Sequence, residues 1–190
     1  MKKLFLSTLL IGATAGAYAQ GFIALDNGNN TNSSPAAASG GLFFLNGAAV
    51  TADFNAAFYG GTDSANLSLI ATFLLSNHTA DGDVTGLNQA GRFYDPTGGS
   101  YPIANSTTTA FIQVQAWTGQ FSSYAAAVAA GAPAAQSSVF ANGVAIPPST
   151  APELDSMPGV NMTAGVVPEP STFALAGLGA AAMLIFRRRK

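Results

Sequence analysis

The sequence of 190 residues contains no cysteine and only one histidine, His78. Without cysteine the chain has no disulfide framework and no thiolate nucleophile. One histidine offers little for nucleophilic catalysis or for a zinc site, which needs three or four converging ligands. Basic residues are also scarce. Six of the seven lie at the two ends of the chain, as Lys2, Lys3, Arg187, Arg188, Arg189 and Lys190, and only Arg92 lies between them.

The region between the two ends is therefore acidic. Residues 21–167 contain one cation against eight carboxylates, a formal charge of −7, whereas the whole chain carries −2. Such a surface repels phosphate-rich partners, so we expect neither nucleic acid nor anionic lipid to bind it. The region is long enough for one domain with a hydrophobic core, which must supply the stability that disulfides would otherwise add.

The N-terminus has the three parts of a secretory signal peptide. Lys2 and Lys3 precede an uncharged, mostly apolar run over residues 4–17. Ala17 and Ala19 then form a small-residue cleavage box before Gln20. We predict that residues 1–19 are a signal peptide, and that the chain is exported through the secretory translocon.

The C-terminus has a second three-part pattern. An uncharged apolar run covers residues 173–186; as a helix it spans about 21 Å at about 1.5 Å per residue, short of a hydrocarbon core of about 30 Å. Snorkelling arginines narrow this gap, and the terminal cations hold their end in the cytoplasm, so we expect a transmembrane helix. Two prolines keep the preceding backbone extended, where an enzyme could read it. The motif is Val167, Pro168, Glu169, Pro170, Ser171 and Thr172, and the basic end is Arg187, Arg188, Arg189 and Lys190.

This tail resembles the PEP-CTERM sorting tail over about residues 166–190. Pro168, Glu169 and Pro170 form the tripeptide that gives the family its name, and the apolar helix with its arginine-rich end completes the pattern. The resemblance implies a diderm bacterium with an exopolysaccharide system and an exosortase, an integral-membrane enzyme that processes such tails. The middle of the chain is also similar to uncharacterised β-rich ectodomains that accompany this tail, which adds no activity.

Alternating β-branched and aromatic residues predict strands in the middle of the chain. The longest candidates cover residues 54–59, 68–75 and 108–117, and the shorter ones cover 22–25, 42–45, 92–94 and 139–145. One helix is expected over residues 122–130, before Gly131 and Pro133. The fold class predicted is mainly β, a single antiparallel β-sandwich with one short inserted helix.

The chain divides into four predicted parts. Residues 1–19 are the signal peptide, 20–146 the β-sandwich ectodomain, 147–166 a proline-rich linker and 167–190 the sorting tail. The linker assignment depends on four prolines and the lack of a clear apolar period. Residues 27–41, rich in Asn, Ser and Gly, are expected to form a long loop.

Candidate chemistry in the domain is sparse. His78, Asp81 and Asp83 lie close together in the sequence, but we interpret them as ordinary turn residues; a calcium loop at the two aspartates stays open. No metal or cofactor is expected. Five aromatic residues are of the types that stack on sugar rings: Tyr59, Tyr94, Tyr101, Trp117 and Tyr124. Of these, Trp117, Tyr94 and Tyr101 are the possible ligand contacts.

Three functional hypotheses follow from these features. We favour an exported, non-enzymatic cell-surface or matrix protein that an exosortase sorts and that associates with extracellular polysaccharide. The alternatives are a carbohydrate-binding module and a secreted glycoside-acting enzyme with an acidic pair, since the members of such a pair need meet only in space. Carboxylates facing each other across a cleft would favour the enzyme.

Overall fold

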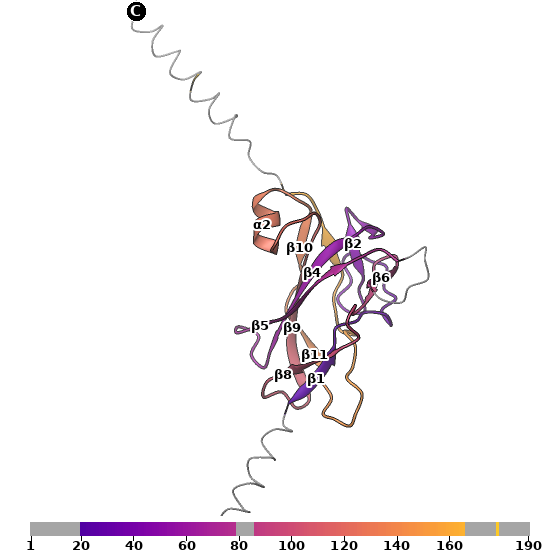
Figure 1. Cartoon of the computed structure of the whole chain (residues 1–190), viewed down its shortest axis with the longest axis vertical. Coiled ribbons are helices and arrows are strands. Elements are labelled where there is room, and N and C mark those ends of the chain that lie inside the picture. Colours follow the sequence, from indigo (N-terminus) through magenta and orange to yellow (C-terminus); the bar gives the residue numbers. More distant parts are fainter. Residues whose placement is uncertain (1–19, 79–85, 166–177, 179–190) are drawn as a thin grey trace, which may run out of the picture.

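The computed structural model describes residues 20–78, 86–165 and 178. They form a mainly β body with one short helix, α2, at one end of it (Figure 1). The elements are β1 (Gly21–Ala24), β2 (Phe43–Leu45), β3 (Ala48–Ala49), β4 (Phe54–Gly61), β5 (Ser68–Leu75), β6 (Gly86–Gln89), β7 (Arg92–Tyr94), β8 (Ser100–Ile103), β9 (Thr109–Trp117), α2 (Tyr124–Ala129), β10 (Ala134–Gln136), β11 (Phe140–Gly143) and β12 (Val160–Met162).

A five-stranded antiparallel sheet forms the middle of the body. Its order is β10-β9-β4-β5, and β11 pairs with the other half of the same edge of β9. The long strands β4 and β9 alternate between faces: Phe54, Ala56, Phe58 and the aliphatic residues of β9 point to the core. Such alternation is the signal from which these strands were expected.

Smaller sheets cover the inner face of this central sheet. β1 pairs with β8, β6 with β7, and β2 lies between β3 and β12. Phenylalanine rings join these sheets to the central one. The centre of the Phe43 ring lies 4.8 Å from that of Phe54 and 5.4 Å from that of Phe93. The rings of Phe93 and Phe58 are also 5.4 Å apart. Tilted and edge-on contacts of this kind add to the free energy gained from burial.

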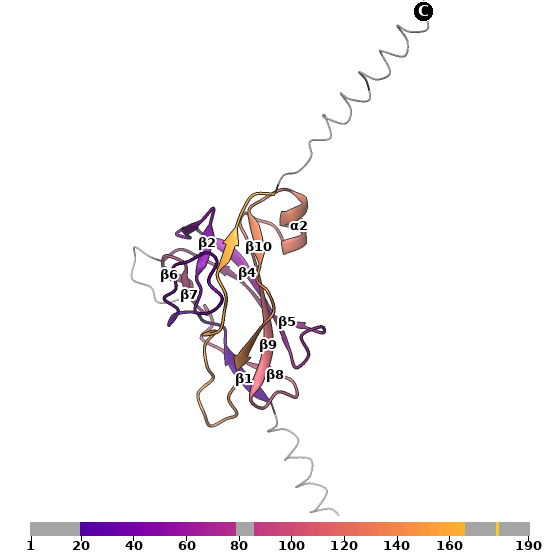
Figure 2. The same cartoon turned by 180° about the vertical axis from the view of Figure 1, so that it is seen from behind.

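The structure corrects the predicted linker over residues 147–166. β12 lies beside β2 (Figure 2) and pairs with it in parallel. Leu154, Met157 and Met162 are fully buried in the main core. The four prolines do not prevent this, because an irregular extended segment can bury apolar side chains without a regular period. The folded domain therefore extends past residue 146 to about residue 163, and one of its strand pairs is parallel rather than antiparallel.

Two buried asparagines order the expected loop over residues 27–41. The Asn27 side chain donates to the Gly91 carbonyl at 3.2 Å and accepts from the Phe93 N–H at 2.7 Å. Asn30 donates to the carbonyls of Gly41 and Leu154 at 3.0 and 3.2 Å. Each side chain satisfies backbone groups that would otherwise be buried without partners, so the loop packs as part of the domain.

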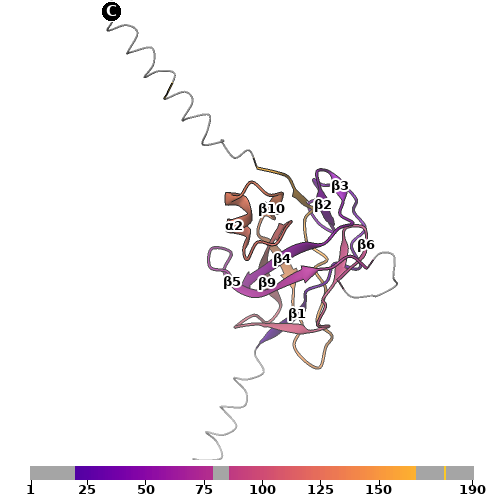
Figure 3. The same cartoon turned by 45° about the horizontal axis from the view of Figure 1, so that its top comes forward.

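The helix and the ends of the body have a simple arrangement. α2 lies against the central sheet (Figure 3). It begins where the Ser123 hydroxyl accepts a hydrogen bond from the Ala126 N–H, and Ala127 packs with Ala57 and Trp117 on the outer face of that sheet. β1 starts at the end of the body opposite α2, and the chain leaves beside α2 after β12 (Figure 1).

The sandwich arrangement of these sheets stays a prediction. Within residues 20–78, 86–165 and 178, no helix has the length and apolar character needed to span a bilayer.

Candidate functional site

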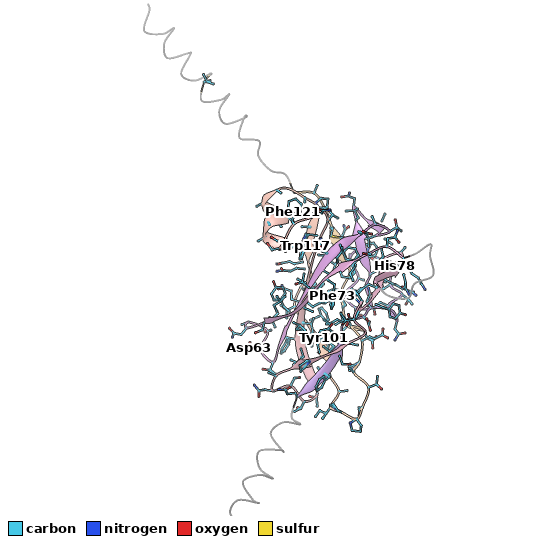
Figure 4. All side chains as sticks on the ribbon, in the orientation of Figure 1. Asp63, Phe73, His78, Tyr101, Trp117 and Phe121 are labelled. Atoms are coloured by element: carbon cyan, nitrogen blue, oxygen red, sulfur yellow. The ribbon has the colours of Figure 1, made fainter. Side chains whose placement is uncertain are left out.

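The residues predicted as possible ligand contacts lie in different places. Trp117 is 2% exposed on the outer face of the central sheet, where its indole N–H donates to the Phe121 carbonyl at 2.9 Å (Figure 4). Tyr101 lies against the main core, with its ring 6.1 Å from that of Phe73. Tyr94 lies over Gly28, since a Cβ added there would be 2.2 Å from the Tyr94 ring. The structure therefore does not combine these three aromatics into one platform.

Tyr101 has a structural partner in Asp95. The Asp95 carboxylate accepts hydrogen bonds from the Tyr101 hydroxyl at 2.8 Å, the Thr97 N–H at 2.7 Å and the Gly99 N–H at 2.9 Å. Burial raises the pKa of the Asp95 carboxyl, but these bonds together outweigh it and hold the pKa below its usual value. Asp95 thus organises the turn between β7 and β8.

Asp26 and Glu153 lie near Asp95 and carry the same charge. Asp26 accepts a short hydrogen bond from the Asp95 N–H, and Glu153 accepts from the Asn29 N–H at 3.1 Å. Burial raises the pKa of Asp26 above its usual value, the hydrogen bond from Asp95 opposes this, and the charges of Glu153 and Asp95 add to the rise. The Asp95 carboxylate binds backbone N–H groups of its own turn, and Asp26 and Glu153 bind those of other segments, which is a structural use of an acidic cluster.

The remaining predicted site residues are less informative. His78 is half-buried at one edge of the body (Figure 4), and its backbone N–H donates to the Leu87 carbonyl at 2.8 Å. Asp81 and Asp83 lie outside the described residues, as do Ala17, Ala19, Val167–Thr172 and Arg187–Lys190, whereas Gln20 is exposed just before β1. Among the described residues, no group of three or more His, Asp or Glu side chains is arranged to hold a metal ion.

Two surface grooves flank the start of β5 and share Leu69. One, of about 340 Å³, lies between the outer face of the central sheet and the start of α2; we call it the α2 groove. The other, of about 420 Å³, lies between the β4–β5 hairpin and β8, and Tyr101 forms part of its wall. The α2 groove is lined by Ala57, Tyr59, Leu69, Thr72, Gln115, Trp117, Ser122, Ser123, Tyr124 and Ala125.

The α2 groove is the site that sequence reasoning missed. Tyr59, Trp117 and Tyr124 were recognised by residue type. Their other neighbours in the groove depend on the strand register, which brings Ala57 opposite both Thr72 and Gln115. A period-two pattern places these side chains on one face of a strand. It does not say which strands are neighbours or where α2 lies.

The comparisons with known proteins identify the tail. Residues 166–190 match the family model of the PEP-CTERM protein-sorting motif. No curated protein and no solved structure matches the chain. The sorting motif predicted from the sequence is confirmed, and the β-rich character of the preceding domain is confirmed by the structure.

Proposed function

Because the chain carries a PEP-CTERM sorting motif, which implies export and surface sorting, we propose that it is a non-enzymatic protein of the cell surface or extracellular matrix. An exosortase processes the tail, and the released domain associates with exopolysaccharide. The observation that carries the proposal is the match over residues 166–190. The net charge of −7 over residues 21–167 supports a partner other than nucleic acid or anionic lipid.

Before processing, the chain is held at the inner membrane. The signal peptide over residues 1–19 directs it through the translocon, and the apolar run over 173–186 stops transfer when Arg187–Lys190 reach the membrane. The domain then lies outside the cytoplasm. It is the mature protein once the tail has been processed.

The tether between the domain and the motif is short. Thr163 pairs with Ala134, and Pro168 of the motif follows five residues later. An extended chain covers at most about 3.6 Å per residue, so the motif lies within about 18 Å of Thr163. Processing therefore takes place beside the folded domain, at the end where α2 and β10 lie.

The uses of the carboxylates support a non-enzymatic role. Both oxygens of Asp95 accept hydrogen bonds from its own turn, and Asp26 and Glu153 bind backbone N–H groups. Neither groove is lined by a carboxylate. We further propose that the central sheet and the smaller sheets are the layers of a β-sandwich, supported by the core that they share.

The proposal is tested by neutralising the motif in the full-length chain. Glu169→Gln, expressed in a diderm host with and without its exosortase, should leave the protein in the inner-membrane fraction. Asp155→Asn is the matched control, because it removes an exposed carboxylate 14 residues upstream. Release of both variants in equal amounts to the surface fraction would contradict sorting through the motif.

A carbohydrate-binding role is a second candidate function. The observation that favours it is the α2 groove, where aromatic, hydroxyl and amide side chains lie together without a charge. The hydrolase alternative has no comparable observation.

A further inference from the structure

The floor of the α2 groove is formed by three neighbouring strands. In the strand register Ala57 of β4 lies between Thr72 of β5 and Gln115 of β9. Ala57 has only a methyl group, while the residues two positions before and after it on this face are Asn55 and Tyr59. A small residue in the middle of the row, surrounded by larger ones, leaves the sheet hollow at this point.

Aromatic side chains and the start of α2 form the walls. Tyr59 and Tyr124 are partly buried and pack with Ala57, Trp117 and Ala127 in one apolar cluster. Trp117 and Phe121 lie close together beside α2 (Figure 4), in the same apolar cluster as Ala127. Since Trp117 is almost fully buried and its N–H already bonds to Phe121, the rings left to contact a ligand are those of the two tyrosines.

Several polar groups of the groove make no hydrogen bond to other described residues. They are the hydroxyls of Tyr59, Thr72, Ser122 and Tyr124 and the Oε1 atom of Gln115, whose Nε2 makes a long bond of 3.4 Å to Gln136. Hydroxyls both donate and accept, and the amide oxygen accepts. Such groups beside an aromatic ring match a sugar, whose C–H face packs on the ring and whose hydroxyls bond the polar groups around it.

The absence of charged residues from the groove indicates which class of ligand it can bind. No Asp, Glu, Lys, Arg or His lines it, and the sequence from 96 to 152, which includes β9 and α2, has no such residue. An anionic ligand finds no cation to pair with there and is repelled by the acidic domain as a whole. A neutral ligand needs no cation as a partner and is not repelled.

We propose that the α2 groove binds neutral saccharide, with Tyr59 and Tyr124 contacting the ring faces and Gln115, Thr72 and Ser122 bonding the hydroxyls. Its volume is at the small end of the range of about 300–1,000 Å³ for ligand pockets, which suits a short stretch of a polysaccharide. The proposal deepens the carbohydrate-binding candidate and rests on it. Sorting through the tail does not depend on it.

The test is calorimetric titration of the full chain, purified in a detergent without a sugar headgroup. The probes are neutral oligosaccharides of glucose, mannose, galactose, xylose and N-acetylglucosamine, with oligogalacturonate as the anionic comparison. Trp117 is the only tryptophan in the chain and lines the groove, so its fluorescence reports whether binding occurs there. We expect at least one neutral probe to bind and to shift the emission, and oligogalacturonate to do neither.

Matched variants assign the binding to the groove. Gln115→Ala should raise Kd about fivefold and Tyr59→Ala about tenfold, the sizes expected for one hydrogen bond and one ring contact. Gln113→Ala is the control, because Gln113 lies two residues away on the same face of β9 and does not line the groove. It should change Kd less than about twofold.

Two results would overturn the proposal. One is that no neutral probe binds; the other is that Gln113→Ala and Gln115→Ala weaken binding equally. Fractionation of cells expressing Gln115→Ala separates this failure from that of the sorting role. A variant that is processed and released normally leaves the role of the tail intact whatever the titration shows.

Discussion

At the scale of single residues, Asp95 shows how a turn residue can resemble a catalytic one. It is a carboxylate that is 3% exposed beside other acids, yet its bonds are those of a turn. Its carbonyl accepts from the Gly98 N–H at 3.0 Å, and Pro96 occupies the next position, which is the preferred order for a type I turn.

Replacing this carboxylate should weaken the fold. Asp95→Ala removes the acceptor of bonds from Thr97, Gly99 and Tyr101, so we expect a loss of about 2–3 kcal/mol in the free energy of unfolding at pH 7. Because the folded pKa of Asp95 is lowered, its contribution is present above the unfolded value and is lost as the pH falls through the folded value. Urea unfolding at pH 7 and pH 3 measures both effects, and an equal loss at the two values would contradict the assignment.

The neighbouring Asp26 should respond in the opposite sense. Its raised pKa means that it favours folding below the unfolded value, and that this contribution is lost as the pH rises through the folded value. Asp26→Asn keeps an oxygen for the Asp95 N–H and removes the repulsion by Glu153 and Asp95. We expect a higher Tm at pH 7, by about 3 °C if the gain is about 1 kcal/mol, and no difference near pH 3. Thermal scans check this, and a lower Tm at pH 7 would refute it.

Residue types alone could suggest Trp117, Tyr94 and Tyr101 as ligand contacts but could not say which are accessible. Burial of Trp117 depends on α2 packing over it, and the Tyr101 hydroxyl is held by a turn six residues before it. Tyr59, a candidate by residue type alone, lines the α2 groove because of the register between β4 and its neighbours.

At the scale of elements, the strands with regular alternation could be predicted and the others could not. β5 and β7 have the expected bounds, and β4, β9 and α2 differ by two residues or fewer at either end. β12 was missed because Leu154, Met157, Val160 and Met162 follow neither a period of two nor one of 3.6, and because prolines surround them. β10 was missed because a strand beginning with two alanines has no β-branched or aromatic signal.

Truncation of a side chain in β12 tests whether this segment belongs to the core. Met162→Ala should lower the free energy of unfolding by about 2–5 kcal/mol, as for other fully buried side chains, whereas Thr163→Ala, at an exposed position, should change it by less than about 0.5 kcal/mol. If chemical unfolding showed equally small changes in the free energy of unfolding for both substitutions, the linker interpretation would be restored.

The edge strand β5 presents a different liability. It ends the order of the central sheet, has no charged residue, and exposes Leu69 and Leu74 by 57% each. Uncharged apolar edges favour pairing with other chains. We expect Leu74→Lys to reduce light scattering of concentrated protein with little change in Tm, and Leu75→Lys, which buries the charge, to unfold the domain. Unchanged scattering for Leu74→Lys would show that this edge is already protected.

At the scale of the whole molecule, charge and sequence position divide the chain into a domain and a sorting device. The cations lie almost entirely in the two ends, and the acidic domain between them has one. The tail could be identified from sequence because it is read as a linear pattern, which needs no folded neighbours. The domain could not be assigned an activity in that way, because its grooves form only when distant strands pair.

The mass of the mature protein is the measurement that tests sorting through the tail most directly. Intact-mass spectrometry of the protein isolated from the cell surface should show a chain that begins near Gln20 and lacks Arg187–Lys190, with its new C-terminus near the motif at Pro168–Pro170. In a strain without exosortase the basic end should be retained, and the protein should stay with the inner membrane. A surface form that still carries Arg187–Lys190 would contradict sorting by processing of the tail.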